Sequence, residues 1–178
     1  MKCQKLFVLA AAIFVGYLSR AQTAGKSTEG ALKAVYKDAF LVGAAVTPAI
    51  TSGADQATQN IVIKQFNSIT VENVMKAALI NPQPGVYNWG PADDYVAFGE
   101  KNKMFIIGHT LVWHNQVPPW FFTNAEGKPN LKEEQIERLR SHIQAVAGRY
   151  AGRVNAWDVV NEVIGEDGAY RSTSWVNA

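Results

Sequence analysis

Short apolar runs alternate with amphipathic segments along this chain. The runs are brief enough for buried strands, and residues such as Gly, Pro, Asn and Ser separate them. We expect four strands, at residues 40–46, 68–72, 104–109 and 154–162. Strands that alternate with helices indicate a parallel sheet joined by crossovers, and this pattern fits both an open doubly wound sheet and a closed barrel.

Periodic segments between these strands predict the helices. We expect helices at about 56–66 and 91–99, and a short turn or helix at 73–79 that ends at a cluster of Pro and Gly residues. A longer helix follows Asn130, which can cap its first turn. One apolar face of this helix is formed by Ile136, Leu139, Ile143, Val146 and Tyr150.

The N-terminus has the pattern of a secretory signal peptide. Lys2 and Lys5 precede an apolar run at residues 6–18, which is too short to span a membrane, and Ala21 fits the end of a cleavage site. We therefore expect a secreted protein, periplasmic or extracellular, with no membrane association after cleavage. The expected divisions are a leader at 1–21, an N-terminal segment at 22–39 and a domain at 40–178.

Charge and cysteine content exclude several classes of function. The chain has 17 Lys and Arg against 15 Asp and Glu, but the leader holds three of the basic residues, so 14 would remain after cleavage. No basic tract is left to bind nucleic acid. Cys3, the only cysteine, lies in the leader, and the three His residues lack the spacing of a zinc site. Because phosphate-loop and dinucleotide motifs are also missing from the sequence, we expect no metal and no cofactor.

The segment from Trp157 to Glu162 ends a predicted strand with an Asn-Glu pair. An unpaired buried charge is costly, so a Glu at the exit of an apolar strand must meet solvent, a partner or a substrate. Glu162 is therefore a candidate for acid/base chemistry. A Glu that caps the next turn or forms a salt bridge is the more frequent case, and this alternative stays open.

Polar and aromatic residues also follow two other predicted strands. Glu72, Asn73 and Lys76 follow the second strand, and His109, Trp113 and His114 follow the third. Exits of parallel strands face the same end of a sheet, and hydrogen-bonding groups beside aromatic planes suit a sugar. The alternatives are an ion pair between Glu72 and Lys76, a structural role for His109, and core positions for Trp113, Trp120 and Trp157.

Three ordered blocks of the sequence resemble the signature blocks of the family 10 glycoside hydrolases, the endo-1,4-β-xylanases. They are residues 66–76 (FNSITVENVMK), 108–118 (GHTLVWHNQVP) and 157–162 (WDVVNE). The resemblance runs from about residue 40 to the end and implies a (β/α)8 TIM barrel. A full barrel needs about 250 residues, so we expect a truncated polypeptide with about the first four βα units.

The resemblance also implies an activity, which is endo-acting hydrolysis of the β-1,4-xylosidic bonds of xylan with retention of configuration. It further implies a protein that is monomeric at full length. Glu162 matches the general acid/base, and Asn161 matches the neighbour that bonds the sugar at the cleavage site. Five residues match positions that line the glycone subsites: Glu72, Asn73, Lys76, His109 and Trp113. Asp158 lies further down the strand, and we expect a structural role for it.

One part of the family's machinery has no counterpart in the sequence. The family's nucleophile lies on a seventh strand that this sequence lacks, so we expect the chain alone to be inactive. Lys76 is followed by Ala77 and Ala78, where the family usually has a bulky residue and then an acid. The alternatives are a related retaining β-1,4-glucanase and an inactive half-barrel fragment that binds carbohydrate.

Overall fold

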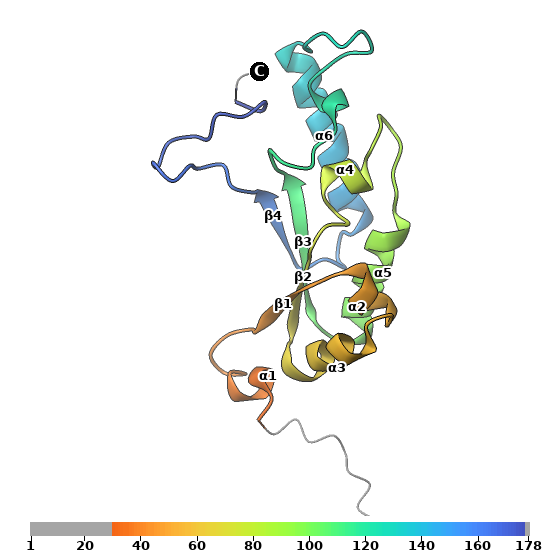
Figure 1. The fold of residues 1–178 in the computed structure, drawn as a ribbon, viewed down its shortest axis with the longest axis vertical. Helices are drawn as coiled ribbons and strands as arrows, with labels where there is room; N and C mark the ends of the chain where they lie inside the picture. The colour runs from red at the N-terminus through yellow and green to blue at the C-terminus, as the bar shows by residue number, and fades with distance from the viewer. Residues whose placement is uncertain (1–29, 177–178) are drawn as a thin grey trace, which may run out of the picture.

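The computed structural model describes residues 30–176, which form a four-stranded parallel sheet (Figure 1). The strands are β1 (Gly43–Val46), β2 (Ser68–Val71), β3 (Phe105–Val112) and β4 (Ala156–Val160). They lie side by side in chain order, and each is parallel to the next. The predicted parallel α/β arrangement is therefore confirmed. The predicted signal peptide lies outside the described residues.

Helices cover one face of this sheet. In chain order they are α1 (Leu32–Val35), α2 (Pro48–Ser52), α3 (Gln56–Gln65), α4 (Ala77–Ile80), α5 (Gly90–Lys101), the 3-10 helix η1 (Pro119–Phe121) and α6 (Lys132–Arg149). Figure 1 shows α2, α3, α5 and α6 on the same side of the strands. The apolar core lies between these two layers and includes Ile69 and Ile106 from the sheet and Val96 and Val146 from the helices. No helix within residues 30–176 is long and apolar enough to cross a membrane.

Two glycines allow close packing on β3 and on α5. A Cβ at Gly99 in α5 would lie 2.6 Å from Ile106 Cγ1, so the helix can approach the sheet only without a side chain there. A Cβ at Gly108 would lie 2.3 Å from the ring of Trp157, which needs that space. A side chain at Gly99 would push α5 away from the sheet, and one at Gly108 would displace the Trp157 ring.

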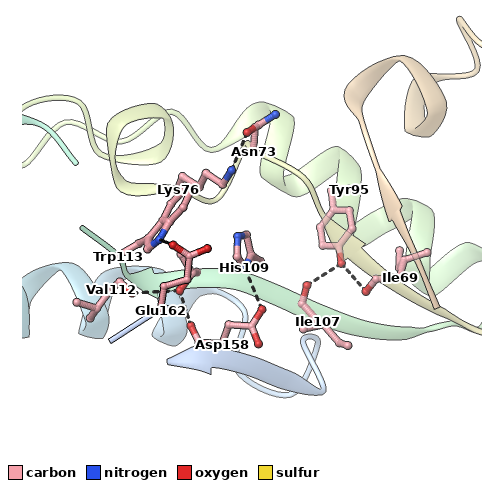
Figure 2. A network of polar contacts seen from close by, with 11 residues as sticks. Ile69, Asn73, Lys76, Tyr95, Ile107, His109, Val112, Trp113, Asp158 and Glu162 are labelled. Carbon is pink, nitrogen blue, oxygen red and sulfur yellow. Dashed lines mark hydrogen bonds and ion pairs between the residues drawn. The ribbon is translucent and has the colours of Figure 1, made fainter. Parts of the chain in front are cut away.

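Tyr95 joins α5 to the two central strands. Its hydroxyl oxygen lies 2.9 Å from the carbonyl oxygen of Ile69 in β2 and 2.8 Å from that of Ile107 in β3 (Figure 2). The side chain is buried, and burial raises its pKa. A neutral hydroxyl is thus shared between two strand carbonyls, and this contact fixes the height of α5 on the sheet.

Several boundaries differ from the predicted ones. β1 begins at Gly43 rather than at residue 40, because Phe40 and Leu41 are exposed and take no part in the ladder. β3 runs past the expected end at residue 109 to Val112, and β4 is shorter than expected, so Glu162 follows it. The helices α1, α2 and η1 were not predicted, since such short elements show no apolar period.

The predicted cap of the long helix was wrong. Leu131 occupies the N-cap position of α6, and its backbone N–H donates to Glu134 Oε2 at 3.1 Å. Asn130 is buried one residue earlier and donates its side-chain N–H to the carbonyl of Phe121 at 3.2 Å. Asn130 therefore ties η1 to the start of the helix instead of capping it.

The predicted apolar face of α6 is correct except at its beginning. Val146 and Tyr150 are buried, and Leu139 and Ile143 pack against the core. Ile136 is 46% exposed, contrary to expectation. Figure 1 shows the N-terminal part of α6 extending past the ends of the strands, where the sheet does not cover the helix.

Candidate active site

The residues singled out from the sequence lie at the rim, by which we mean the C-terminal ends of β2, β3 and β4. Glu72 and Asn73 follow β2 directly, Trp113 follows β3, and Asn161 and Glu162 follow β4. Because the strands are parallel, these C-terminal ends lie together at one end of the sheet, where barrel enzymes place their active sites. His109 is the exception, since β3 continues past it and its side chain projects from within the strand.

Trp113 and Glu162 form the central contact at the rim. The indole Nε1 of Trp113 donates to Glu162 Oε2 at 2.8 Å (Figure 2). The Glu162 side chain is 49% exposed, and the same carboxylate oxygen lies 3.8 Å from His114 Nε2. A carboxylate that is held by a neutral donor and still open to solvent can exchange a proton with a bound molecule.

Lys76 lies over the face of the Trp113 ring. Its ammonium nitrogen is 4.7 Å from the ring centroid, within the range of a cation–π contact, and it donates to Asn73 Oδ1 at 2.9 Å. Lys76 is buried, whereas Glu72 is exposed. Among the described residues no ion pair joins Glu72 to Lys76, so the alternative of a helical ion pair is wrong.

His109 is held by Asp158. The imidazole Nδ1 lies 2.9 Å from Asp158 Oδ2, and because an ionised carboxylate only accepts, Nδ1 is the donor. The side chains are 17% and 46% exposed, respectively. The ring of His109 lies 6.1 Å from that of Trp113. Asp158, expected to be structural, thus orients a predicted site residue.

The structure groups most of the predicted site residues but not all of them. A continuous series of contacts runs from Asn73 through Lys76 and Trp113 to Glu162, and His109 lies beside it (Figure 2). The side chains of Glu72 and Asn161 take no part in these contacts. Asn161 is placed instead by its backbone N–H, which donates to the carbonyl of Val112 at 2.9 Å.

The other two candidate tryptophans have structural positions. Trp157 packs over Gly108 on the sheet, and Trp120 donates its indole N–H to the carbonyl of Asn81 at 3.2 Å. Both are partly buried. The alternative of a core position is right for Trp157, which packs against the apolar core. Trp120 lies outside that core and stacks on the ring of Phe121.

Three residues close to the site were not among the predicted site residues. His114 was noted in the sequence but not proposed for the site, and Arg171 and Trp175 belong to the loop after β4. Arg171 Nε donates to the carbonyl of Glu162 at 3.1 Å, and Trp175 Nε1 donates to the carbonyl of Trp113 at 2.8 Å. Only the three-dimensional course of the loop brings them back to the rim.

These groups suit a carbohydrate. An indole face can stack on the C–H face of a sugar ring, and amide, ammonium and imidazole groups can bond its hydroxyls. Within residues 30–176 there is no group of three His, Cys, Asp or Glu side chains that could hold a metal ion. The rim thus offers a proton-exchanging carboxylate beside a surface for neutral polar ligands.

The family model and similar known sequences indicate the same family. The model of glycosyl hydrolase family 10 matches residues 31–178. A β-1,4-xylanase of Dictyoglomus thermophilum is 47% identical over 136 residues, which cover 76% of this chain and 36% of that protein. An endo-1,4-β-xylanase/feruloyl esterase of Xylanibacter ruminicola is 43% identical over 168 residues, which cover 92% of this chain and 23% of that protein.

Solved structures agree with the sequence relatives. A family 10 endoxylanase retrieved from a sugarcane soil metagenome superposes with a TM-score of 0.78 at 44% identity, over 82% of this chain and 43% of that chain. A mutant solved in complex with xylotriose has a TM-score of 0.76 at 40% identity, over 83% and 44% of the two chains. The chain thus spans less than half the length of these relatives. Because the family model matches far more than half of its residues, the chain belongs to glycosyl hydrolase family 10.

Proposed function

We propose that this chain supplies the acid/base half of the active site of a secreted, retaining endo-1,4-β-xylanase. The hydrogen bond from Trp113 to Glu162 carries the proposal, because it fixes a half-exposed carboxylate at the rim of a family 10 sheet. The names of the two relatives described above, a β-1,4-xylanase and an endo-1,4-β-xylanase/feruloyl esterase, support xylan as the substrate. The neighbour in complex with xylotriose supports xylo-oligosaccharides as ligands.

Glu162 has two tasks in this reaction. It protonates the glycosidic oxygen as the leaving group departs, and as a carboxylate it then takes a proton from the water that cleaves the glycosyl-enzyme intermediate. The Trp113 N–H holds the carboxylate in both steps, since it can donate to the acid and to its anion. The partial exposure of Glu162 leaves it accessible to a polysaccharide.

The remaining rim residues bind the sugar in this proposal. Asn161 bonds the sugar at the cleavage site, and Glu72, Asn73, Lys76, His109 and Trp113 line the glycone side. The exposed Glu72 carboxylate has no bond to another described residue, so it is available for sugar hydroxyls. Lys76 and His109 are already oriented by Asn73 and Asp158, which lowers the cost of ordering them on binding.

In this proposal the nucleophile lies outside the described residues. A retaining enzyme needs a second carboxylate about 5–5.5 Å from the acid/base, and the resemblance assigns it to a seventh strand. Four strands are present within residues 30–176. We expect the purified chain to release no reducing sugar from xylan above background, and measurable hydrolysis would contradict this view of the chemistry.

The role of Glu162 can be tested in a xylanase in which this chain is joined to the remaining barrel units. Glu162→Gln should lower kcat/KM on xylan by about 10²–10⁴-fold, because the leaving group then departs unprotonated. Activated aryl xylosides need little protonation and should lose much less. Equal losses on both substrates would contradict the assignment. The matched control is Glu133→Gln on the exposed surface of α6, which should leave both rates unchanged.

A further inference from the structure

The chain turns back to the rim after Glu162 through a short hairpin. We call residues 163–175 the return loop. Its turn is closed by backbone bonds from Gly165 N–H to the carbonyl of Ala169 at 2.8 Å and from Gly168 N–H to that of Gly165 at 3.0 Å. Gly168 has a positive φ of 80°, which a glycine adopts without strain. The hairpin therefore has a defined shape that delivers its second arm to the site.

The second arm contacts the backbone at Glu162. Arg171 donates through its backbone N–H to the carbonyl of Val163 at 2.9 Å and through its side-chain Nε to that of Glu162 at 3.1 Å. Glu162 itself has a φ of 54°. This left-handed conformation is unfavourable for a residue with a Cβ, so contacts around it must hold it in place.

The end of the return loop contacts the other partner of the central hydrogen bond. Trp175 donates its indole N–H to the carbonyl of Trp113 at 2.8 Å. Its ring meets those of Phe121 and Phe122 edge-on, with centroids 5.7 Å and 4.5 Å away. Trp175 is thus anchored in the η1 region while it holds the backbone that carries the Trp113 indole.

These contacts form a closed ring. Arg171 holds Glu162, Trp175 holds Trp113, and Trp113 bonds the Glu162 carboxylate. All four residues line one cavity of about 50 Å³. The four residues therefore form one connected unit around this small cavity.

We propose that Arg171 and Trp175 are positioning residues that set the geometry of the Trp113–Glu162 hydrogen bond from the backbone side. Neither touches the carboxylate, and both act through main-chain carbonyls. This inference deepens the proposed function, because it names the groups that keep the acid/base in place. The hydrogen bond exists in the chain without substrate, so it can be tested separately from catalysis.

The test uses the Trp113 indole as a spectroscopic probe. In ¹⁵N-labelled protein, Trp113→Phe and Trp175→Phe identify their own resonances among the five indole N–H signals. In Arg171→Met we expect the Trp113 indole proton to move upfield and to exchange with solvent at least roughly tenfold faster, as its bond to a charged group weakens. Arg171→Lys, which can still donate to the Glu162 carbonyl, should restore most of the protection.

Further variants separate positioning from stability. Trp175→Phe keeps the ring against Phe121 and Phe122 but removes the donor, and it should also release the Trp113 indole proton. Arg140→Met is the matched control, because Arg140 lies on the surface of α6 and pairs with Glu137. Unchanged Trp113 resonances in both Arg171→Met and Trp175→Phe would overturn the proposal. If Arg171→Met fails to fold, Trp175→Phe decides alone. The spectra do not depend on catalysis. If Glu162 were not the acid/base, the Trp113 signals in these variants would still report whether Arg171 and Trp175 position the hydrogen bond.

Discussion

A histidine and a tryptophan donate to one acceptor residue in the interior, and a second histidine and tryptophan donate to carboxylates at the rim. In the interior the acceptor is Asn81, which is completely buried. His142 Nδ1 lies 3.2 Å from its Oδ1, and Trp120 donates to its carbonyl at the same distance. Asn81 Nδ2 donates to the carbonyls of Gln83 and Val86 at 2.9 Å each. Its Oδ1 must therefore accept, so His142 carries its proton on Nδ1.

At the rim the donors are of the same kind but the acceptors are charged. His109 donates to Asp158 at 2.9 Å, and Trp113 donates to Glu162 at 2.8 Å. The two carboxylate side chains are 46% and 49% exposed. Each distance is shorter than its counterpart in the interior, as charge-assisted hydrogen bonds usually are.

The difference follows from the cost of burying charge. A neutral amide can be fully buried if its donors and acceptor are paired, whereas a buried carboxylate would need a compensating cation. The interior cluster joins α6, η1 and the loop after α4, so it should contribute to stability. The rim cluster keeps its carboxylates partly in water, where they are available to a ligand and contribute little to stability.

The sharpest test of this contrast is Asn81→Leu. The substitution keeps the volume of the side chain but leaves the buried His142 N–H and two loop carbonyls without their partner. We expect the free energy of unfolding to fall by about 3 kcal/mol, since an unpaired buried donor costs about 1–3 kcal/mol and the two lost hydrogen bonds to the loop add to that cost. Urea unfolding followed by tryptophan fluorescence measures this loss.

Asn130→Leu is the matched control for Asn81→Leu. Asn130 is also a buried asparagine, but it donates one side-chain hydrogen bond and its Oδ1 has no partner among the described residues. Its loss should be clearly smaller. Equal losses for the two variants would show that burial alone, and not the network around Asn81, determines the effect.

Sequence patterns found the rim cluster more readily than the interior one. Glu162, Trp113 and His109 are near the exits of apolar strands, and parallel strands bring such exits together whatever the loops do. Asn81 and His142 are 61 residues apart, and neither stands at a position that marks it. Their contact depends on how α6 lies against the loop after α4, which no local pattern encodes. Arg171 and Trp175 were missed for the same reason.

The interior cluster should also make the fold sensitive to mild acid. Burial lowers the pKa of His142 to about 4, against an ordinary value near 6.5, although the backbone of Leu111 opposes this shift. Below pH 6.5 the unfolded chain therefore binds a proton that the folded chain does not. The contribution of neutral His142 to the free energy of unfolding should be fully present above this pH. It should fall by about 1.4 kcal/mol per pH unit toward pH 4, which amounts to a loss of about 2 kcal/mol at pH 5.

His142→Gln should remove this slope between pH 6.5 and 4. Acid unfolding below about pH 4 should persist, because hydrogen bonds from Arg149 and Arg153 lower the pKa values of Asp93 and Glu100. Their stabilisation is lost only as those carboxyl groups protonate. A wild-type protein with constant stability from pH 7 to pH 5 would show that His142 gains a partner when it is protonated.

The smallest effects are expected at the rim. Asp158→Asn and Glu162→Gln each keep an oxygen that accepts from His109 or Trp113, and each removes one half-exposed charge. We expect the free energy of unfolding at pH 7 to change by less than about 0.5 kcal/mol in either variant, against about 3 kcal/mol for Asn81→Leu. Urea unfolding of the three variants side by side gives the ratio directly. A loss above about 1 kcal/mol at the rim would mean that these carboxylates hold the sheet edge together, and the division between a stabilising interior and a functional rim would then fail.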